Sequence, residues 1–395
     1  MHLTHDAVPD LPADSPSNGL VPAPTGRQSI KLSRIVIFFE RREDVISRAV
    51  RRGFSRHRAD EVSHWLLPSK DIKHTVASLR DTASRSGVDI ELLCTTQIVE
   101  GADRSIFEWA RRGGLLFWNI TDGCAFFSGS HLTSLALLIN VPYFGCPPFA
   151  QALAQDKFKL FQLCTALGIA APDSALVENG EIICTFTGRP KGPFFVKPNS
   201  LGNKIGLHDA SLCSSLKTAL QQATTINHEL FDRAVVQEFI EGPEIRVTFI
   251  NGHLQPNGFC FGYDLIDSNA TSRSFIPFHK REKKYNSFRD FTASDVFPKS
   301  YRSSVVKKIT HSISTIARHV RLKDYFTFDF RIDSSGSPRL IDFNPGAFLC
   351  GGDVENYALQ KFQRPLPAVL FSAMDNCFQG RQCRLFSEVG SLFRL

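Results

Sequence analysis

Two aspartates and an asparagine near residue 340 have the types and spacing of a metal site. Phenylalanines alternate with polar residues over 326–331, which is the two-residue period of a strand with one polar face. Turn-forming residues fill 333–338, and a second alternating run follows. A symmetric hairpin would place Asp329 directly opposite Asp342, with Asn344 on the same face two residues further on.

Like charges that face each other across two strands are destabilising unless something binds between them. Two carboxylates and an amide oxygen are ligands that Mg²⁺ accepts, commonly together with substrate phosphates. A solvated polar face is the competing interpretation. The third oxygen ligand and the following Pro345-Gly346 strengthen the interpretation as a site for Mg²⁺ or Mn²⁺, so that both interpretations stay open for the hairpin taken alone.

A lysine at the end of an apolar strand leads into a glycine-containing loop over 194–207. Lys197 is costly to bury unless an anion meets it. Gly202 and Gly206 allow backbone N–H groups to wrap a phosphate. The loop is not a Walker motif because its lysine precedes the glycines. Many hairpins share these features, so this segment alone does not define a phosphate site.

The segment 235–247 reads as two strands around a tight turn. Its backbone from Gln237 to Ile240 would be able to hydrogen-bond an adenine edge, and Glu244 would be able to accept ribose hydroxyls. A plain hairpin with solvated glutamates is the alternative for this segment taken alone.

The helices and strands predicted around these segments fall into two parts of the chain. Apolar runs at 35–39, 90–94 and 114–120 predict strands, and 43–58 and 71–86 predict helices between them, as in an open α/β lobe. Further on, we expect helices over 149–167 and 301–319 and shorter strands between them.

The resulting domain prediction has four parts. They are a disordered tail (1–30), an N-terminal α/β domain (31–147), a two-lobed domain (148–375) and a C-terminal tail (376–395). The two lobes are expected at about 160–235, as a small lid lobe, and about 236–375, as a central lobe.

Composition limits the remaining classes of function. The 395 residues carry a net charge of +7 without a long basic block, which argues against nucleic-acid binding. No apolar run approaches the roughly 20 residues that span a bilayer, and no secretory signal is visible. The 10 dispersed cysteines are expected to be reduced thiols in a cytoplasmic protein.

Taken in order, these segments resemble the ATP-grasp superfamily and, within it, the D-alanine–D-alanine ligase group. The match covers about Leu135 to Phe348 and rests on INVPYFGCPPFAQALAQDKFKLFQLCTALGIAAPDS, FFVKPNSLGNKIGL, VVQEFIEGPEIRVTFING and LIDFNPG. The resemblance implies an N-terminal α/β lobe followed by a two-lobed α+β ATP-grasp fold, with ATP and Mg²⁺ as cofactors.

The resemblance also assigns roles by position. The residues expected to contact ATP are Lys157, Lys197, Gly202, Asn203, Lys204, Glu238, Phe239, Ile240, Glu244 and Lys284. Metal ligands would be Asp329, Asp342 and Asn344, the three residues that the hairpin argument selects independently.

This sequence departs from the group near its acceptor site. Thr327 stands where relatives carry an arginine that helps to hold the acyl phosphate, and Arg331 on the same face is the candidate replacement. Arg331 and Lys284 are therefore the candidate catalytic residues. The Asn344-Pro345-Gly346 ending is shorter than the corresponding segment of the group. Where the group has its first-lobe signature, this sequence has Trp118-Asn119-Ile120-Thr121-Asp122-Gly123.

We therefore expect an ATP-dependent ligase that joins a carboxylate, such as an amino acid, to an amine through an acyl phosphate. A small-molecule kinase on the same scaffold and a non-catalytic nucleotide-binding protein are the alternatives. The expected partners are small-molecule carboxylates and amines, with neither nucleic acid nor membrane, and analogy with the group suggests a homodimer.

Overall fold

A computed structural model provides the structure of this protein. It describes residues 30–63, 69–99, 101, 105–120, 130–189, 192–251, 262–267, 290–291, 299, 302–346, 358–359 and 362–380. Contacts divide the chain into Met1–Lys31 and Leu32–Leu395, and every element below belongs to the second unit. None of the helices within the described ranges combines the length and apolar character needed to cross a membrane.

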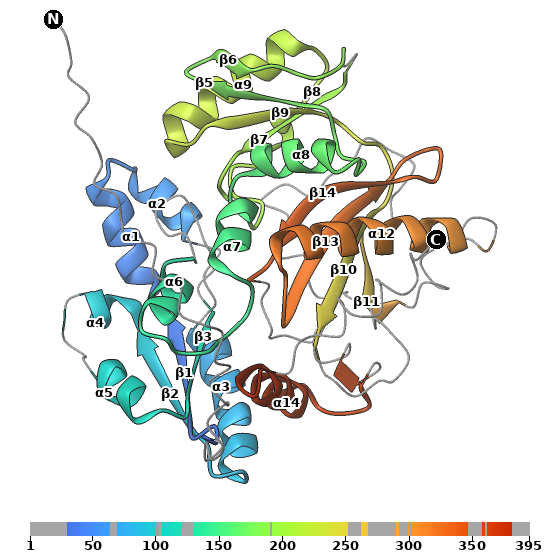
Figure 1. Ribbon diagram of the computed structural model, residues 1–395. Helices are drawn as coiled ribbons and strands as arrows, with labels where there is room; N and C mark the ends of the chain where they lie inside the picture. The colour runs from blue at the N-terminus through green and yellow to red at the C-terminus, as the bar shows by residue number, and fades with distance from the viewer. Residues whose placement is uncertain are drawn as a thin grey trace, which may run out of the picture. The chain divides into compact units, whose positions relative to one another are not determined.

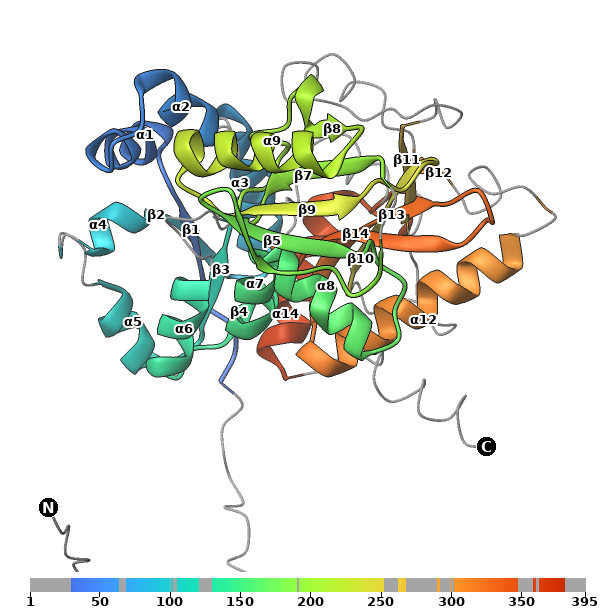
Figure 2. The same cartoon turned by 90° about the horizontal axis from the view of Figure 1, so that it is seen from above.

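The first sheet is parallel and has the order β2-β1-β3-β4 (Figures 1 and 2). Its strands are β1 (Arg34–Phe39), β2 (Asp89–Cys94), β3 (Leu115–Asn119) and β4 (Tyr143–Phe144). The interior of β1 and all of β3 are buried, as expected for parallel strands covered on both faces. The three strands predicted in this part of the sequence are confirmed.

Helices α1 (Arg42–Arg51) and α2 (Arg56–Val62) occupy the segment between β1 and α3. The prediction of one continuous helix over 43–58 was wrong, because Gly53 takes a φ of +100° and turns the chain between the two helices. The other helices of this part of the chain are α3 (Ser69–Ser84), α4 (Thr95–Val99), α5 (Ser105–Arg112) and α6 (Ser130–Leu138).

The single helix predicted over 149–167 is likewise two helices, α7 (Pro148–Ala154) and α8 (Lys157–Ala166). Asp156 separates them, and its carboxylate accepts the Lys159 backbone N–H at 3.0 Å as the N-cap of α8. The break places Lys157 in the first turn of α8.

A second sheet, with the order β6-β5-β9-β7-β8, forms the small lobe. Its strands are β5 (Ser174–Glu178), β6 (Glu181–Cys184), β7 (Phe194–Pro198), β8 (Leu212–Cys213) and β9 (Ala234–Glu238). Helix α9 (Leu216–Leu230) packs on one face, against Val196 and Val236. Helix α8 packs on the other face, against Leu176 and Val235 (Figure 2).

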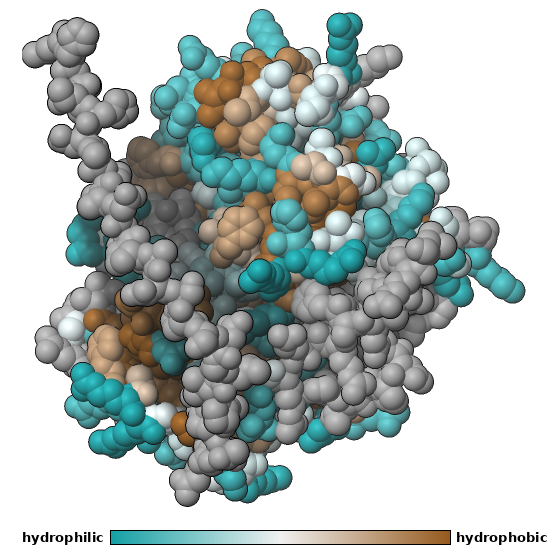
Figure 3. Space-filling model, in the orientation of Figure 1, coloured by the Kyte–Doolittle hydropathy of each residue, from teal (hydrophilic) through white to brown (hydrophobic). Residues whose placement is uncertain are grey.

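The edge strand of this lobe has exposed apolar side chains. Ile182 and Ile183 in β6 are 37% and 46% exposed. Figure 3 shows the apolar surface over β5 and β6. An exposed apolar edge strand is able to pair with another chain.

The third sheet has the order β12-β11-β10-β13-β14 and forms the central lobe. Its strands are β10 (Glu244–Ile250), β11 (Gly262–Asp267), β12 (Asp290–Phe291), β13 (Tyr325–Ile332) and β14 (Pro338–Asn344). The phenylalanines of β13 bury one face of this sheet against α12 (Arg302–Val320) and the apolar residues of α7 and α8. The polar residues of β13 therefore project from the opposite face.

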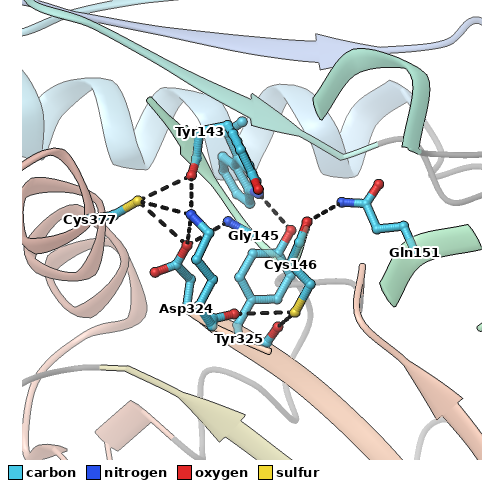
Figure 4. Close-up of polar contacts among 9 residues, drawn as sticks. Tyr143, Gly145, Cys146, Gln151, Asp324, Tyr325 and Cys377 are labelled. Carbon is cyan, nitrogen blue, oxygen red and sulfur yellow. Dashed lines mark hydrogen bonds and ion pairs between the residues drawn. The ribbon is translucent and has the colours of Figure 1, made fainter. Parts of the chain in front are cut away.

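The last described helix, α14 (Leu366–Phe378), crosses the predicted domain boundary at residue 375. It packs beside α3, and its apolar residues share a core with the first sheet (Figure 1). The carbonyl of Tyr143 accepts hydrogen bonds from Lys323 Nζ at 2.8 Å and from Cys377 Sγ at 3.1 Å, which joins β4, the start of β13 and α14 (Figure 4).

Candidate functional site

The hairpin of β13 and β14 has the register that the sequence predicts at its acidic end. Asp329 pairs directly with Asp342, and Thr327 pairs with Asn344. A bulge between Asp329 and Phe330 shifts the register, so β14 carries one residue more than β13. Because Leu340 and Phe343 are both buried in the core, the two residues between them lie on the other face. The bulge thus gives Asp342 its position opposite Asp329.

Arg246 explains how two opposed aspartates are tolerated in this structure. It pairs with Asp329 across β10 and β13. Its Nε and Nη2 donate to the two carboxylate oxygens of Asp329, each at 2.8 Å. This bidentate ion pair balances one of the two negative charges. Sequence reasoning missed Arg246, although its position two residues after Glu244 places both side chains on one strand face.

Lys197 lies where the small lobe meets the central lobe. Its side chain is 8% exposed, and its Nζ donates to the Ile341 carbonyl at 3.0 Å, next to Asp342 in the chain. Burial lowers the pKa of Lys197 from 10.5 to about 8, although Asp342 opposes the shift and favours the charged form. Lys157 adds to the lowering of this pKa. A partly desolvated cation therefore lies among the acids of the hairpin.

Lys157 reaches the glycine loop from α8. Its side chain is 5% exposed, and its Nζ donates to the Leu201 carbonyl at 2.8 Å. Asn203 and Lys204 in this loop have φ values of +51° and +61°. Two successive left-handed residues are uncommon outside glycine and indicate a tightly turned backbone. Gly202 has open space around the position that a Cβ would take among the described atoms.

The strand segment predicted to face adenine is anchored by its backbone. The N–H of Glu238 donates to Asp173 O and that of Phe239 to Pro193 O, each at 2.9 Å. The carbonyl of Ile240 accepts from Arg331 Nη1 at 3.0 Å. These bonds fix the segment between the two lobes.

Arg331 contacts the segment that is predicted to face adenine and ribose. Its Nη2 lies 3.2 Å from Glu244 Oε2, and its guanidinium stacks over the ring of Phe239 at 4.8 Å. The arginine is 4% exposed. These contacts favour a role in holding Ile240 and Glu244, and the predicted catalytic role of Arg331 stays a prediction.

Gln237 is a second residue that sequence reasoning missed. It alternates along β9 with Val236, which faces α9, so its side chain lies on the other face of the sheet. The residue is 4% exposed, and its Oε1 has no hydrogen-bond partner among the residues that the structure describes. A buried unpaired amide oxygen is uncommon in a folded protein and marks a position for a missing donor.

The oxygen atoms of the hairpin suit a hard cation. Among the described residues, no three His, Cys, Asp or Glu side chains form a metal cluster, so a site here needs the amide of Asn344. Asp342 Oδ1 already accepts the Phe343 N–H at 3.0 Å, and Asn344 Oδ1 accepts the Gly346 N–H at 2.9 Å. Carboxylate and amide oxygens retain further lone pairs after one such bond, so the donor set fits Mg²⁺. The remaining candidate, Lys284, lies outside the described residues.

Part of this chain is similar in sequence to known proteins. Residues 166–347 match the family model described as the D-Ala–D-Ala ligase C-terminus. The vancomycin C-type resistance protein VanC1 of Enterococcus gallinarum is 27% identical over 56% of this chain and 60% of that relative. The D-alanine–D-alanine ligase of Aquifex aeolicus is 24% identical over 52% of this chain and 64% of that protein. The chain thus spans about 60% of the length of these relatives.

Solved structures extend the likeness over most of the fold. The D-alanine–D-alanine ligase of Bacillus anthracis complexed with ATP has a TM-score of 0.54, with 14% identity, and covers 88% of this chain and 98% of its own. The VanG D-Ala:D-Ser ligase of Enterococcus faecalis has a TM-score of 0.56, with 16% identity, and covers 88% of this chain and 100% of its own. The chain is therefore similar in fold to D-alanine–D-alanine and D-Ala:D-Ser ligases, and its residues 166–347 match the family model of the ligase C-terminus.

Proposed function

We propose that this protein is an ATP-dependent carboxylate–amine ligase that acts on an amino acid or a related carboxylate. The observation that carries the proposal is the contact between Lys197 Nζ and the Ile341 carbonyl at 3.0 Å. This contact brings a buried cation of the small lobe to a central-lobe hairpin in which Asp329 faces Asp342. Cations and oxygen ligands on facing lobes are what a nucleotide triphosphate with a divalent metal requires.

ATP would lie between the two lobes, with each end held by different groups. Lys157, Lys197 and the loop with Gly202, Asn203 and Lys204 would bind the phosphates, and Lys284 would add a further positive charge. The backbone of Glu238 and Ile240 would meet adenine beside Phe239, and the unpaired amide oxygen of Gln237 would accept from its amino group. Glu244, held by Arg331, would accept the ribose hydroxyls.

The same hairpin would hold the metal. Asp329, Asp342 and Asn344 are the proposed ligands, and Arg246 would stay as the counter-ion of Asp329. A bound Mg²⁺ or Mn²⁺ would offset the negative charge of the phosphates as a carboxylate approaches them.

The proposed reaction has two steps. A substrate carboxylate oxygen attacks the γ-phosphorus of ATP, and the bond to the β-phosphate oxygen breaks, which gives an acyl phosphate and ADP. The nitrogen of an amine then attacks the acyl carbon, a C–N bond forms, and phosphate leaves. Lys197 would stabilise the charge of the transferred phosphoryl group in its partly desolvated position. We also propose that the protein acts on small molecules in the cytoplasm and that it works as a homodimer.

A small-molecule kinase is the second candidate, and one feature of the hairpin favours it. Thr327, which is 8% exposed, pairs with Asn344 at the position where an arginine would support an acyl phosphate. A kinase does not need that support, because its phosphorylated product is stable. The nature of the product therefore separates the two reactions.

The test is incubation with Mg²⁺, ATP and a panel of amino acids and other carboxylates, with and without hydroxylamine. A ligase should release ADP and phosphate and form a hydroxamate when hydroxylamine captures the acyl group. A stable phosphorylated acceptor without free phosphate would establish the kinase instead.

The variant Asp342→Asn provides the matched test of the site. Loss of one proposed ligand charge should reduce turnover by at least about a hundredfold, the scale seen when one group that stabilises transition-state charge is removed. Unchanged turnover, or no ADP release by the parent protein across the panel, would contradict an ATP-consuming enzyme with this site.

A further inference from the structure

Glu61 of α2 reaches the glycine loop of the small lobe. Its side chain is 3% exposed, and its Oε1 accepts the N–H of Gly206 at 2.9 Å. The two residues are 145 positions apart in the sequence. A buried carboxylate that binds a backbone N–H forms a strong, charge-assisted hydrogen bond.

Helix α2, which carries Glu61, and the preceding helix α1 pack against the small lobe. Apolar residues of α1, α2 and their connection share one core with β5, β7, β9, α9 and the glycine loop. Leu201 and Ile205 of the loop are 3% and 1% exposed within this core. The ring of Phe54 also packs edge-on against Phe231, with centroids 4.8 Å apart. The helix pair follows β1 of the first lobe in the chain and packs with the small lobe in space.

The glycine loop is held from two directions. Lys157 Nζ donates to the carbonyl of Leu201 at its start, and Glu61 accepts the N–H of Gly206 at its end. Gly206 has a φ of +74°, and a Cβ there would lie 2.6 Å from Leu230 Cδ1 and 2.7 Å from Pro198 Cγ. The end of the loop is therefore pressed against the small lobe, and Glu61 satisfies the N–H that this conformation presents.

Arg58 compensates the charge of Glu61. Its Nη1 donates to Glu61 Oε2 at 2.5 Å, and its Nη2 forms an ion pair with Glu229 of α9. A bare carboxylate beside a phosphate-binding loop would repel ATP. The arginine, which Glu61 shares with Glu229, offsets part of this repulsion and leaves the hydrogen bond to the loop in place.

We propose that Glu61 is a positioning residue for the phosphate loop, and that α1 and α2 form part of the ATP-binding lobe. This inference rests on the proposed function, since it assigns the loop to the phosphates of ATP. Glu61 touches no phosphate in this scheme. It fixes the backbone of 202–206 in the shape that binds one, and Arg58 keeps it electrically balanced.

The experiment measures the binding of Mg·ATP by calorimetry, together with steady-state kinetics, for Glu61→Ala, Glu61→Gln and Asp60→Ala. Loss of the hydrogen bond in Glu61→Ala should raise the Kd and KM of ATP about tenfold or more. The kcat at saturating ATP and the KM of the carboxylate should change little. Glu61→Gln keeps an oxygen acceptor and should bind ATP as the parent does. Asp60→Ala, an exposed acid on the same helix, should also be unchanged.

A second pair of variants tests the charge balance and covers the case in which Glu61→Ala does not fold. Arg58→Met leaves the Glu61 carboxylate unbalanced and should weaken ATP binding. The double variant Arg58→Met/Glu61→Gln removes both charges and should restore it. Hydrogen exchange of the Gly206 amide in the nucleotide-free protein should be slow in the parent and in Glu61→Gln and fast in Glu61→Ala.

These results separate the two proposals. Unchanged ATP affinity in Glu61→Ala, or no restoration in the double variant, would overturn the role of Glu61 while the proposed function stands. A parent protein that binds no ATP would overturn the proposed function, and the role of Glu61 would fall with it. Slow hydrogen exchange of the Gly206 amide in that protein would then show that the hydrogen bond between Gly206 and Glu61 is purely structural.

Discussion

The environment of Lys197 makes its charge depend on pH near neutrality. Burial holds its pKa at about 8, below the ordinary 10.5, and the nearby Lys157 acts in the same direction. Between these two values the unfolded chain binds more protons at Lys197 than the folded chain does. The free energy of unfolding of the nucleotide-free protein should therefore gain a contribution from this group as the pH rises from about 8 to 10.5.

ATP binding should reverse this effect, because phosphate anions favour the protonated lysine. We expect an uptake of roughly half a proton on ATP binding at about pH 8, and almost none at about pH 6.5. Calorimetry in buffers of different ionisation enthalpy measures this uptake. The variant Lys197→Arg remains charged throughout this range and should take up no proton. Equal uptake at both pH values in the parent would contradict the proposed contact with phosphate.

The ion pair of Arg246 with Asp329 should influence the affinity of the hairpin for the proposed metal. The variant Arg246→Leu removes the cation from Asp329 and leaves it facing Asp342. We expect a loss of about 1 kcal/mol in the free energy of unfolding without metal, since the arginine is partly solvent-exposed. Because the two carboxylates then lack a counter-ion, Mg²⁺ should raise the melting temperature more in this variant than in the parent.

Thermal unfolding with and without Mg²⁺ measures this difference, and Arg246→Lys is the control that retains the charge. An equal stabilisation by Mg²⁺ in Arg246→Leu and the parent would argue against a metal site at Asp329 and Asp342.

At the scale of elements, periodicity predicted strands better than helix ends. The strand pair with the alternating phenylalanines and the buried strands of the first sheet follow from local pattern. The helix breaks at Gly53 and Asp156 interrupt otherwise apolar periodic runs, and their turn and cap chemistry was not used in the prediction. The bulge beside Asp329 was not predicted either, because a bulge depends on how two strands pair across the sheet.

Local sequence pattern likewise predicted some residues of the candidate site and missed others. Lys197, Asp329 and Asp342 stand out locally as charged residues in apolar strands, and the structure brings them to one place. Arg246 and Glu61 act through partners that are far away in the sequence. Only the order of strands in the sheets and the packing of α2 on the small lobe reveal these pairs, and local pattern contains neither.

The turn between β9 and β10 requires glycine at position 242. Gly242 has a φ of +137°, and a Cβ there would lie 1.8 Å from the carbonyl oxygen of Ile332. The variant Gly242→Ala should therefore displace the turn from β13 and disturb the adjoining Glu244. We expect a loss of at least about 2 kcal/mol in the free energy of unfolding, as for a strained backbone position, together with weaker ATP binding.

Chemical denaturation and ATP calorimetry test this prediction, with Gly87→Ala as the control. Gly87 also has a positive φ, of +70°, but no described atom lies within 4 Å of its Cβ position. Its substitution should cost only about 1 kcal/mol and leave ATP affinity unchanged. Equal losses in the two variants would show that the contact with Ile332 is unimportant.

At the scale of the whole molecule, a buried hydrogen bond joins the first lobe to the central lobe. Trp118 Nε1 of β3 donates to the hydroxyl of Tyr325 at the start of β13, at 3.0 Å (Figure 4). The two side chains are 3% and 2% exposed. The variant Tyr325→Phe leaves the indole N–H buried without its acceptor, which should lower the free energy of unfolding by about 1–3 kcal/mol.

Denaturant unfolding followed by tryptophan fluorescence measures this loss. Trp118→Phe and the double variant complete a cycle that separates the hydrogen bond from the packing of each ring. A coupling energy near zero between the two positions would show that the bond does not help to hold the lobes together.

Helix α14 has a consequence for how the protein is made. It covers α3 with Leu366, Val369 and Leu370, yet a ribosome must synthesise residues 145–365 after β4 before this helix exists. Until then, the nascent first lobe presents an uncovered apolar surface on α3. Chaperones that bind apolar segments should therefore occupy the growing chain at this lobe and leave it only after α14 has been synthesised.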